Sequence, residues 1–292
     1  VGGYSYFSFG YETIDYEERL ASAVPGLNLD FKLRSDGSVS SPTIRTGGLA
    51  VINETFDFSI DTSATFAPQS DNETWYMDID YPPANHVGEK PVQANNFSYT
   101  DATSLILTHY KYTENLRLVG GIEFMYHQYK RTEFNFVSPL TQTASYQENC
   151  ILTENNEDCL LMEQVEEGIT NFQIAFGAAY ESGSLSNRFG AHSAKIIMSK
   201  AIWSDVVNSD NTDITFDETG GYSILAEWRS SYKVTKGVNI GLFASYKLTE
   251  RNEQTSDLIR FTQNGMNLTK QVTIPEATTS SLSLGISAVW SL

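Results

Sequence analysis

Ionisable side chains recur at every second position of segments whose alternate positions are largely apolar. These segments are residues 115–133 and residues 222–247. Side chains of this kind form salt bridges, line ion pathways or transfer protons, and they cannot all face a dry protein core. We predict that nine of them line a polar interior: Arg117, Glu123, His127, Arg131, Glu133, Glu227, Arg229, Lys233 and Lys247.

Two other segments carry carboxylates without basic partners. Residues 136–171 hold seven and residues 205–218 hold five, and neither segment contains Lys or Arg. Such runs are typical of solvated loops. The alternative is that they bind Ca²⁺ or Mg²⁺, or use these ions to bridge to a polyanionic cell surface. The net charge of −17 argues against nucleic-acid binding, which needs clustered Lys and Arg.

The two cysteines, Cys150 and Cys159, lie inside the first acidic segment. They have no neighbouring His and therefore make a poor metal site. We predict a local disulfide, formed in an oxidising compartment. The chain has no glycine-rich phosphate loop, redox CxxC motif or zinc spacing. No cofactor is expected beyond Ca²⁺ or Mg²⁺ held weakly at the acidic loops.

The elements that position these groups are strands with two chemically different faces. From Leu282 to Leu292, Leu, Ile, Ala and Trp alternate with small, mostly polar residues, which is the side-chain period of a strand. The same alternation returns along the chain, often with charges on one face. A soluble β-sandwich, the runner-up fold, would have to bury one of these faces. A barrel in a bilayer turns the apolar face to lipid and the polar face to its lumen.

We therefore predict an all-β fold, a single antiparallel transmembrane β-barrel that spans residues 1–292 as one domain. Connectors near Asn53, Thr113, Ser184 and Lys236 are short, and the others are long. This asymmetry is typical of periplasmic turns and extracellular loops. Six side chains are predicted to face lipid: Leu116, Ile122, Phe124, Trp228, Leu242 and Trp290.

The strand count depends on two segments near the N-terminus. Residues 27–35 and 43–52 must together form one passage from the extracellular to the periplasmic side. The apolar residues occupy odd positions in one segment and even positions in the other, so we expect a bulge or an upper hairpin between them. With that change of parity, Lys32 and Arg34 join the lumen charges. The polar stretch 67–101 is expected to be a long loop, and Asn264-Gly265 indicates a hairpin in the last loop. Ten membrane strands with β-structure projecting above the bilayer are predicted, with twelve strands as the alternative.

The chain begins at Val1 without a charged and then apolar leader, so it is interpreted as a mature form after signal-peptide removal. Segment order and loop layout resemble Gram-negative outer-membrane barrels, and in length they resemble the ten-stranded omptin proteases. The terminal strand is similar to the assembly signal of such barrels, although it ends in Trp290-Ser291-Leu292 instead of Phe. The resemblance implies location in the outer membrane and contact with its lipid and lipopolysaccharide.

The omptin resemblance also implies a catalytic site, which we tested residue by residue. Asp78 and Asp80 match the acid pair of one loop, and Asp210 matches the acid of another. Thr212 stands where the family places His, so the base that accepts a proton from water is missing. We therefore do not predict an enzyme.

The histidines give no better case for an outer-membrane phospholipase, which needs Ser and His on the lipid-facing wall. His109 and His127 fall on polar strand faces, His86 lies in a loop, and the orientation of His192 is not assigned.

Three hypotheses for function follow from these patterns. The first is a non-enzymatic barrel whose acidic loops serve surface interaction or scaffolding, with a surface protein or a second copy of the chain as partner. The second is a narrow porin-like channel for small solutes. The third is an omptin-like protease or another surface hydrolase. The lumen charges are nearly balanced in sign, which favours an internal salt-bridge network that plugs the barrel over a conducting pore.

Overall fold

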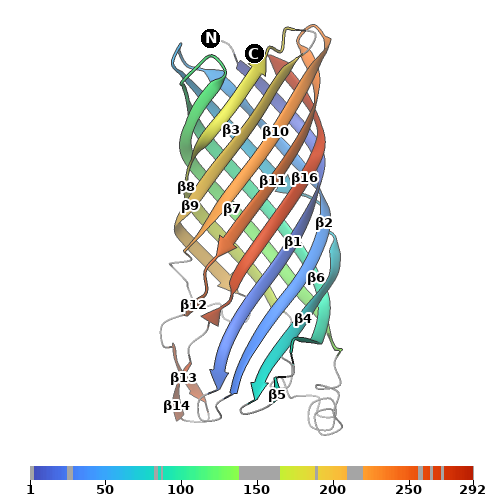
Figure 1. Ribbon diagram of the computed structural model, residues 1–292, viewed down its shortest axis with the longest axis vertical. Helices are drawn as coiled ribbons and strands as arrows, with labels where there is room; N and C mark the ends of the chain where they lie inside the picture. Colours follow the sequence, from blue (N-terminus) through green and yellow to red (C-terminus); the bar gives the residue numbers. More distant parts are fainter. Residues whose placement is uncertain are drawn as a thin grey trace.

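The structure is a computed structural model, and every regular element in its described part is a β-strand (Figure 1). It describes residues 3–24, 29–81, 85–86, 88–137, 165–187, 190–208, 220–255, 259–263, 266–270 and 273–291. In these ranges no helix is long and apolar enough to cross a membrane.

The strands are long, up to 23 residues in β2, and side chains alternate between their two faces. In chain order they are β1 (Gly3–Val24), β2 (Leu29–Val51), β3 (Phe56–Thr65), β4 (Ser70–Tyr81), β5 (Asn85–His86), β6 (Lys90–Lys111), β7 (Leu116–Phe136), β8 (Val165–Gly183), β9 (Ala191–Asn208), β10 (Gly221–Thr235), β11 (Val238–Arg251), β12 (Gln254–Thr255), β13 (Ile259–Gln263), β14 (Met266–Lys270), β15 (Thr273–Ile274) and β16 (Glu276–Ser291).

Ten strands close into a ring of antiparallel neighbours, in the order β1, β16, β11, β10, β9, β8, β7, β6, β3, β2, and back to β1. The ring confirms the predicted barrel and its ten strands. Both chain ends lie at one end of the barrel, together with the short turns (Figure 1). This end corresponds to the predicted periplasmic side. Strands β13 and β14 pair with Gln263 opposite Met266, as expected for the hairpin predicted at Asn264-Gly265.

Two predictions about the extracellular half were wrong. First, β2 runs from Leu29 to Val51 as one strand, with no break at positions 35–42. Second, most of the stretch 67–101 forms strands instead of a loop. After the break at Ala67, whose φ is +48°, β4 continues the line of β3 between β2 and β6. Polar sequence misled both predictions, because a strand above the bilayer has solvent on its outer face and needs no apolar alternation there.

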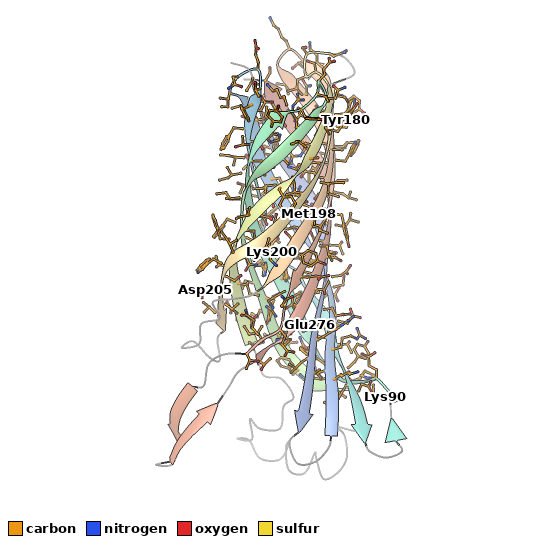
Figure 2. The ribbon with its side chains drawn as sticks, turned by 60° about the vertical axis from the view of Figure 1, so that its left-hand side comes forward. Lys90, Tyr180, Met198, Lys200, Asp205 and Glu276 are labelled. Atoms are coloured by element: carbon orange, nitrogen blue, oxygen red, sulfur yellow. The ribbon has the colours of Figure 1, made fainter. Side chains whose placement is uncertain are left out.

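The outer wall carries a band of exposed apolar side chains (Figure 2). Five of the six residues predicted to face lipid are exposed by 37–49%, and Leu116 is partly exposed. The exposed residues are Ile122, Phe124, Trp228, Leu242 and Trp290. A continuous apolar surface of this size is not stable in water, and it fits the hydrocarbon core of a bilayer.

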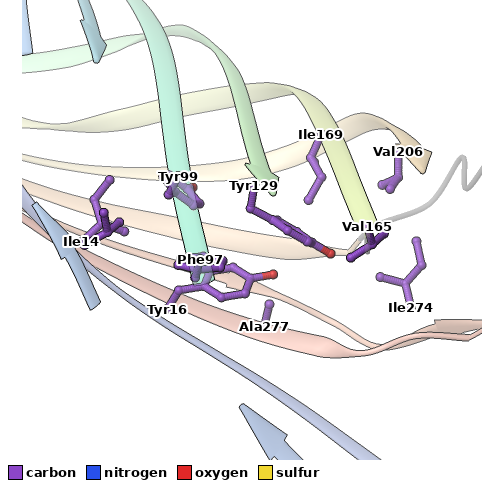
Figure 3. Close-up of a cluster of buried hydrophobic side chains, with 11 residues drawn as sticks. Ile14, Tyr16, Phe97, Tyr99, Tyr129, Val165, Ile169, Val206, Ile274 and Ala277 are labelled. Carbon is purple, nitrogen blue, oxygen red and sulfur yellow. The ribbon is translucent and has the colours of Figure 1, made fainter. Parts of the chain in front are cut away.

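The barrel is longer on one side than on the other. Pairing of β1 with β16 stops at Arg19 opposite Glu276, whereas β1 continues beside β2 as far as Val24 opposite Leu29. Strands β1, β2, β4 and β6 therefore project at the end opposite the termini (Figure 1). Toward this end the interior holds a buried cluster that includes Tyr16, Phe97 and Tyr129 (Figure 3). The inner surface is thus hydrophobic where the strands leave the bilayer.

Candidate functional site: a barrel interior closed by two packed layers

The first layer is a salt-bridge cluster inside the membrane half, which we call the lumen network. Its carboxylates are Asp61 on β3 and Glu227 on β10. Lys195 Nζ lies 2.7 Å from Asp61 and 3.1 Å from Glu227. Arg229 contacts the same two carboxylates at 3.2 and 2.7 Å. Arg45 donates to Glu227 at 2.9 Å. Three cations from three strands thus share two carboxylates across the lumen, so each charged group has a partner of opposite sign.

An aromatic ring extends this layer over the neighbouring strands β16 and β1. Phe243 is buried on the inner face of β11, and its ring lies against Gly10 and Gly285. A Cβ at Gly285 would lie 2.5 Å from Phe243 Cε1, and one at Gly10 would lie 2.8 Å from Cζ, so glycine makes room for the ring. The Arg45 guanidinium lies 4.9 Å from the ring centroid. The lumen is therefore filled by side-chain packing as well as by charge.

The second layer, which we call the extracellular plug, surrounds Arg131 of β7. Arg131 is 1% exposed and makes two hydrogen bonds to Glu73, at 2.6 and 2.8 Å. It also lies 3.1 Å from Glu18. The indole of Trp75 and the ring of Tyr129 pack on its guanidinium at 4.8 and 4.5 Å. A guanidinium placed this way satisfies its donors and also fills space between rings.

The ion pairs keep the plug charged. Burial alone would raise the pKa of Glu18, but Arg131, Arg251 and the hydrogen bond from Tyr16 outweigh it and hold this pKa below its ordinary value. For Arg131, burial opposes the charge, yet Glu18 and Glu73 raise its pKa well above the usual range. Arg251 links the cluster to Glu167 at 3.1 Å. The extracellular end is thus closed by fixed, compensated charges within aromatic surroundings.

Two voids inside the barrel are small, a cavity of about 380 Å³ lies between Leu20, Leu33 and Asp78 of the projecting strands, and a large cavity lies at the other end. The void beside the lumen network measures about 50 Å³, and the void beside the plug about 20 Å³. Each holds a few waters at most. The large cavity, of about 1110 Å³, is lined by Tyr4, Arg117, Lys233 and the turn around Ser184. We call it the periplasmic vestibule. Among the described residues, the two layers thus leave little space between them, and the lumen widens at the vestibule.

The predicted lumen charges divide among these regions. Glu123 and Lys247 form an ion pair in the membrane half, Glu227 and Arg229 belong to the lumen network, and Arg131 centres the plug. Arg117 and Lys233 line the vestibule. His127 is buried against Tyr99, with ring centroids 5.9 Å apart.

Three predicted lumen charges lie on the outside. Glu133 is exposed and accepts a hydrogen bond from Asn96, because a register shift between β6 and β7 interrupts the alternation just before it. Its φ of +59° marks the same irregularity. Lys32 and Arg34 lie on the outer face because β2 has no bulge to change the parity.

The interior also contains charged residues beyond the predicted set: Glu12, Glu18, Arg45, Glu73 and Lys195. For the first strand a signal was present. Phe7, Phe9 and Tyr11 alternate as lipid-facing residues, which places Glu12 and Glu18 on the inner face. Glu73 lies in the stretch that was interpreted as a loop, so no strand parity was assigned to it.

No hydrolytic constellation forms among the described residues. In the ladder, Asp78 lies opposite Lys32 and Asp80 opposite Asp30, on a projecting strand. His109 shares a hydrogen bond with Ser59 at 2.8 Å, but its Nδ1 has no partner. His192 Nδ1 lies 2.6 Å from the Ser230 hydroxyl, which is 1% exposed and closed to a substrate.

Several predicted positions lie outside the described residues. They are Asp210, Thr212, Cys150 and Cys159, together with most of both acidic segments. The disulfide therefore stays a prediction. In the described part of the chain, no group of three or more His, Cys, Asp or Glu side chains could hold a metal ion.

This chain is similar to known proteins in structure but matches none of them in the sequence comparisons. No family model and no curated protein sequence matches this chain. The outer membrane protease OmpT from Escherichia coli matches with a TM-score of 0.60 and 8% identity, over 100% of this chain and 97% of its own. Outer membrane protein OprG from Pseudomonas aeruginosa matches with a TM-score of 0.33 and 8% identity, over 99% and 96%.

Only the first likeness is high enough to describe this fold, and at 8% identity it describes the fold alone. The apolar band on the outer wall supplies the independent evidence for a membrane. Together they show an outer-membrane β-barrel with the ten-strand layout of the omptin fold.

Proposed function

We propose that this protein is a non-conducting outer-membrane barrel that presents its extracellular strands and acidic loops for surface interaction. The observation that carries this proposal is the extracellular plug, where Arg131 is fully paired with Glu73 and Glu18 and enclosed by Trp75 and Tyr129. A solute path would have to break these ion pairs and displace the rings. Removing one partner from such a buried pair costs about 3–5 kcal/mol, which is too much for a spontaneously open channel.

The same geometry argues against the two alternatives. A porin needs a water-filled lumen, and the two voids inside this one hold only isolated waters. A hydrolase needs an accessible nucleophile or activated water beside a base. The described Ser–His pairs lack a third group, and Ser230 is buried. What remains is the surface formed by the projecting strands and the loops that they carry.

Single-channel recording in planar bilayers tests the non-conducting barrel. We expect no reproducible ion steps from the native chain. The variant Arg131→Ala, Trp75→Ala, Arg45→Ala, Phe243→Ala removes the centre of the plug and opens the lumen network as well. It should produce transient openings, which shows that inserted protein can be detected. The matched control Arg19→Ala, Lys32→Ala changes the outer face only and should remain silent. Stable steps from the native chain would mean that the protein is a channel.

The acidic loops are proposed to act through divalent cations. Residues 136–171 and 205–218 contain twelve carboxylates and no basic residue. Three of these, Glu166, Glu167 and Asp205, lie on β8 and β9, and the other nine are expected to repel one another and any polyanionic surface. Ca²⁺ or Mg²⁺ offsets that repulsion by bridging carboxylates. We expect millimolar Ca²⁺ to slow proteolysis of these loops more than NaCl of equal ionic strength does. Identical digestion in the two salts would remove the cation bridge and leave ordinary solvated loops.

A further inference from the structure

The periplasmic vestibule combines a large volume with a charge opposite to that of the chain. Its lining contributes three carboxylates, Asp57, Glu114 and Glu181, against a larger set of cations. These cations are Lys111, Arg117, Arg229, Lys233 and Lys236. The whole protein carries −17, so a local excess of cations in a cavity is not explained by composition. A cavity of about 1110 Å³ also slightly exceeds the range of typical small-molecule sites.

Three of the cations follow one another along β10 and the turn that ends it. Arg229 lies deepest, at the lumen network, Lys233 comes four residues later, and Lys236 lies in the turn at the mouth. Among the described residues, neither Lys233 nor Lys236 has a carboxylate within ion-pair distance. Lys233 Nζ donates only to the carbonyl oxygen of Ser186, at 3.1 Å. The inner face of β10 therefore carries a track of positive charge that is unpaired toward the mouth.

A fourth cation of the vestibule lies on β7 and has one donor without a partner. Arg117 lies 3.9 Å from Asp57 and 3.8 Å from Glu181, both longer than a charge-assisted hydrogen bond. Its Nη1 donates to the carbonyl oxygens of Thr113 and Glu114, at 2.9 and 3.0 Å, whereas its Nε has no hydrogen-bond partner. Asp57 is engaged more closely by Lys111, at 2.8 Å. An anion that entered here would meet a guanidinium whose carboxylate neighbours satisfy it incompletely.

We propose that the periplasmic vestibule binds a small multivalent anion, a phosphate ester or polycarboxylate, between Arg117 and the Lys233–Lys236 track. Serine hydroxyls of the lining, including Ser184 and Ser193, supply neutral donors between the charges. The lumen network closes the inner end of the vestibule, so the anion binds there and does not cross the barrel. The site faces the periplasm, at the end opposite the plug, and it does not depend on the loops.

Lysine acetylation followed by mass spectrometry locates the site in the full chain in detergent. Pyrophosphate and citrate serve as separate probes for phosphate and carboxylate ligands, each against NaCl at equal ionic strength. We expect at least one probe to protect Lys233 and Lys236 severalfold, while the exposed extracellular Lys90 and Lys130 react as before. Protection by pyrophosphate alone, or by citrate alone, identifies the ligand chemistry. If Lys233 and Lys236 are labelled as much with either probe as with NaCl, the proposal is overturned. It is also overturned if a probe protects all four lysines equally.

A charge-matched pair of variants measures the contribution to affinity. Titration calorimetry with the protecting probe compares Lys233→Gln, Lys236→Gln with Lys90→Gln, Lys130→Gln, which loses the same charge on the outside. The first variant should bind at least about tenfold more weakly, because a charge-assisted contact is worth more than one decade of affinity. The second should bind like the native chain. Heat-modified migration in electrophoresis shows that both variants are folded, and equal affinity for both would contradict the proposed site.

Discussion

Side chains alternate between inward and outward at both ends of this barrel, but the lumen is filled at one end and open at the other. At the extracellular end the inward positions are large, such as Tyr16, Phe97 and Tyr129, and they close the lumen around Arg131. At the periplasmic end many inward positions are small, such as Ser231 and the residues of β16, and a cavity of about 1110 Å³ remains. Strand periodicity thus determines which side chains point inward, and their sizes determine whether the lumen is filled.

The charges differ between the two ends as well. In the plug every described cation has a carboxylate within 3.4 Å, in surroundings that exclude water. In the vestibule Lys233 and Lys236 have none, and water or a ligand must satisfy them. A buried charge without a partner is costly, whereas a charge beside solvent is not. Pairing is therefore required at the closed end and optional at the open one.

The largest expected effect is at the plug. Arg131→Met leaves Glu73 and Glu18 buried without their main partner, and should lower the free energy of unfolding by about 3–5 kcal/mol. Arg19→Met removes a cation that is 60% exposed and pairs with Glu17, and should cost at most about 1 kcal/mol. Urea unfolding in phospholipid vesicles, followed by tryptophan fluorescence, measures both. Equal losses would show that the plug is hydrated.

The next effect concerns the outer wall between the two ends. Phe124→Arg places a charge in the apolar band, and should cost about 2–4 kcal/mol if the site lies near the bilayer midplane. Gln128→Arg, four residues further on the same strand face, lies beyond the last large apolar residue and should cost about 0–1 kcal/mol. The same unfolding assay compares them. A cost at position 128 as large as that at position 124 would move the membrane boundary toward the plug.

The barrel was predictable because each bilayer strand has one face whose chemistry is imposed by lipid. Phe124 and Leu242 alternate with polar neighbours, and that pattern alone gave the ring and the short turns. Above the bilayer the constraint disappears, since both faces of a strand can be polar. β4, which carries Glu73 and Trp75, was therefore interpreted as loop. The sequence therefore did not indicate that Glu73 and Trp75 belong to the plug.

Which charged side chains pair with each other inside the barrel is harder to predict from the sequence than the strands are. Parity places Arg131 inside but does not say that Glu73, 58 residues earlier, will meet it. Closure of the ring sets such pairs, through strand register and tilt. The vestibule depends on side-chain size at many inward positions together, so no single segment indicates it.

The smallest expected effect is the response of the plug to acid. The pKa of Glu18 lies below its ordinary value because Arg131 and Arg251 outweigh burial. A carboxylate with a lowered pKa adds stability that is complete above its unfolded pKa, about 4.3. That stability is lost as the pH falls through the folded value. We therefore expect constant plug stability from pH 7 to about 5 and a decline below pH 4.

Trp75 reports this change, because its ring lies 4.8 Å from the Arg131 guanidinium. Its environment should alter when protonated Glu18 releases Arg131, and urea midpoints measured by tryptophan fluorescence should fall over the same range. The variant Glu18→Gln cannot lose that charge, so its midpoint should start lower and change less with pH. Lys233→Gln, at the open end, should keep the native profile. An identical acid response in the native chain and Glu18→Gln would assign the effect to another carboxylate of the plug and separate acid sensitivity from the Glu18–Arg131 pair.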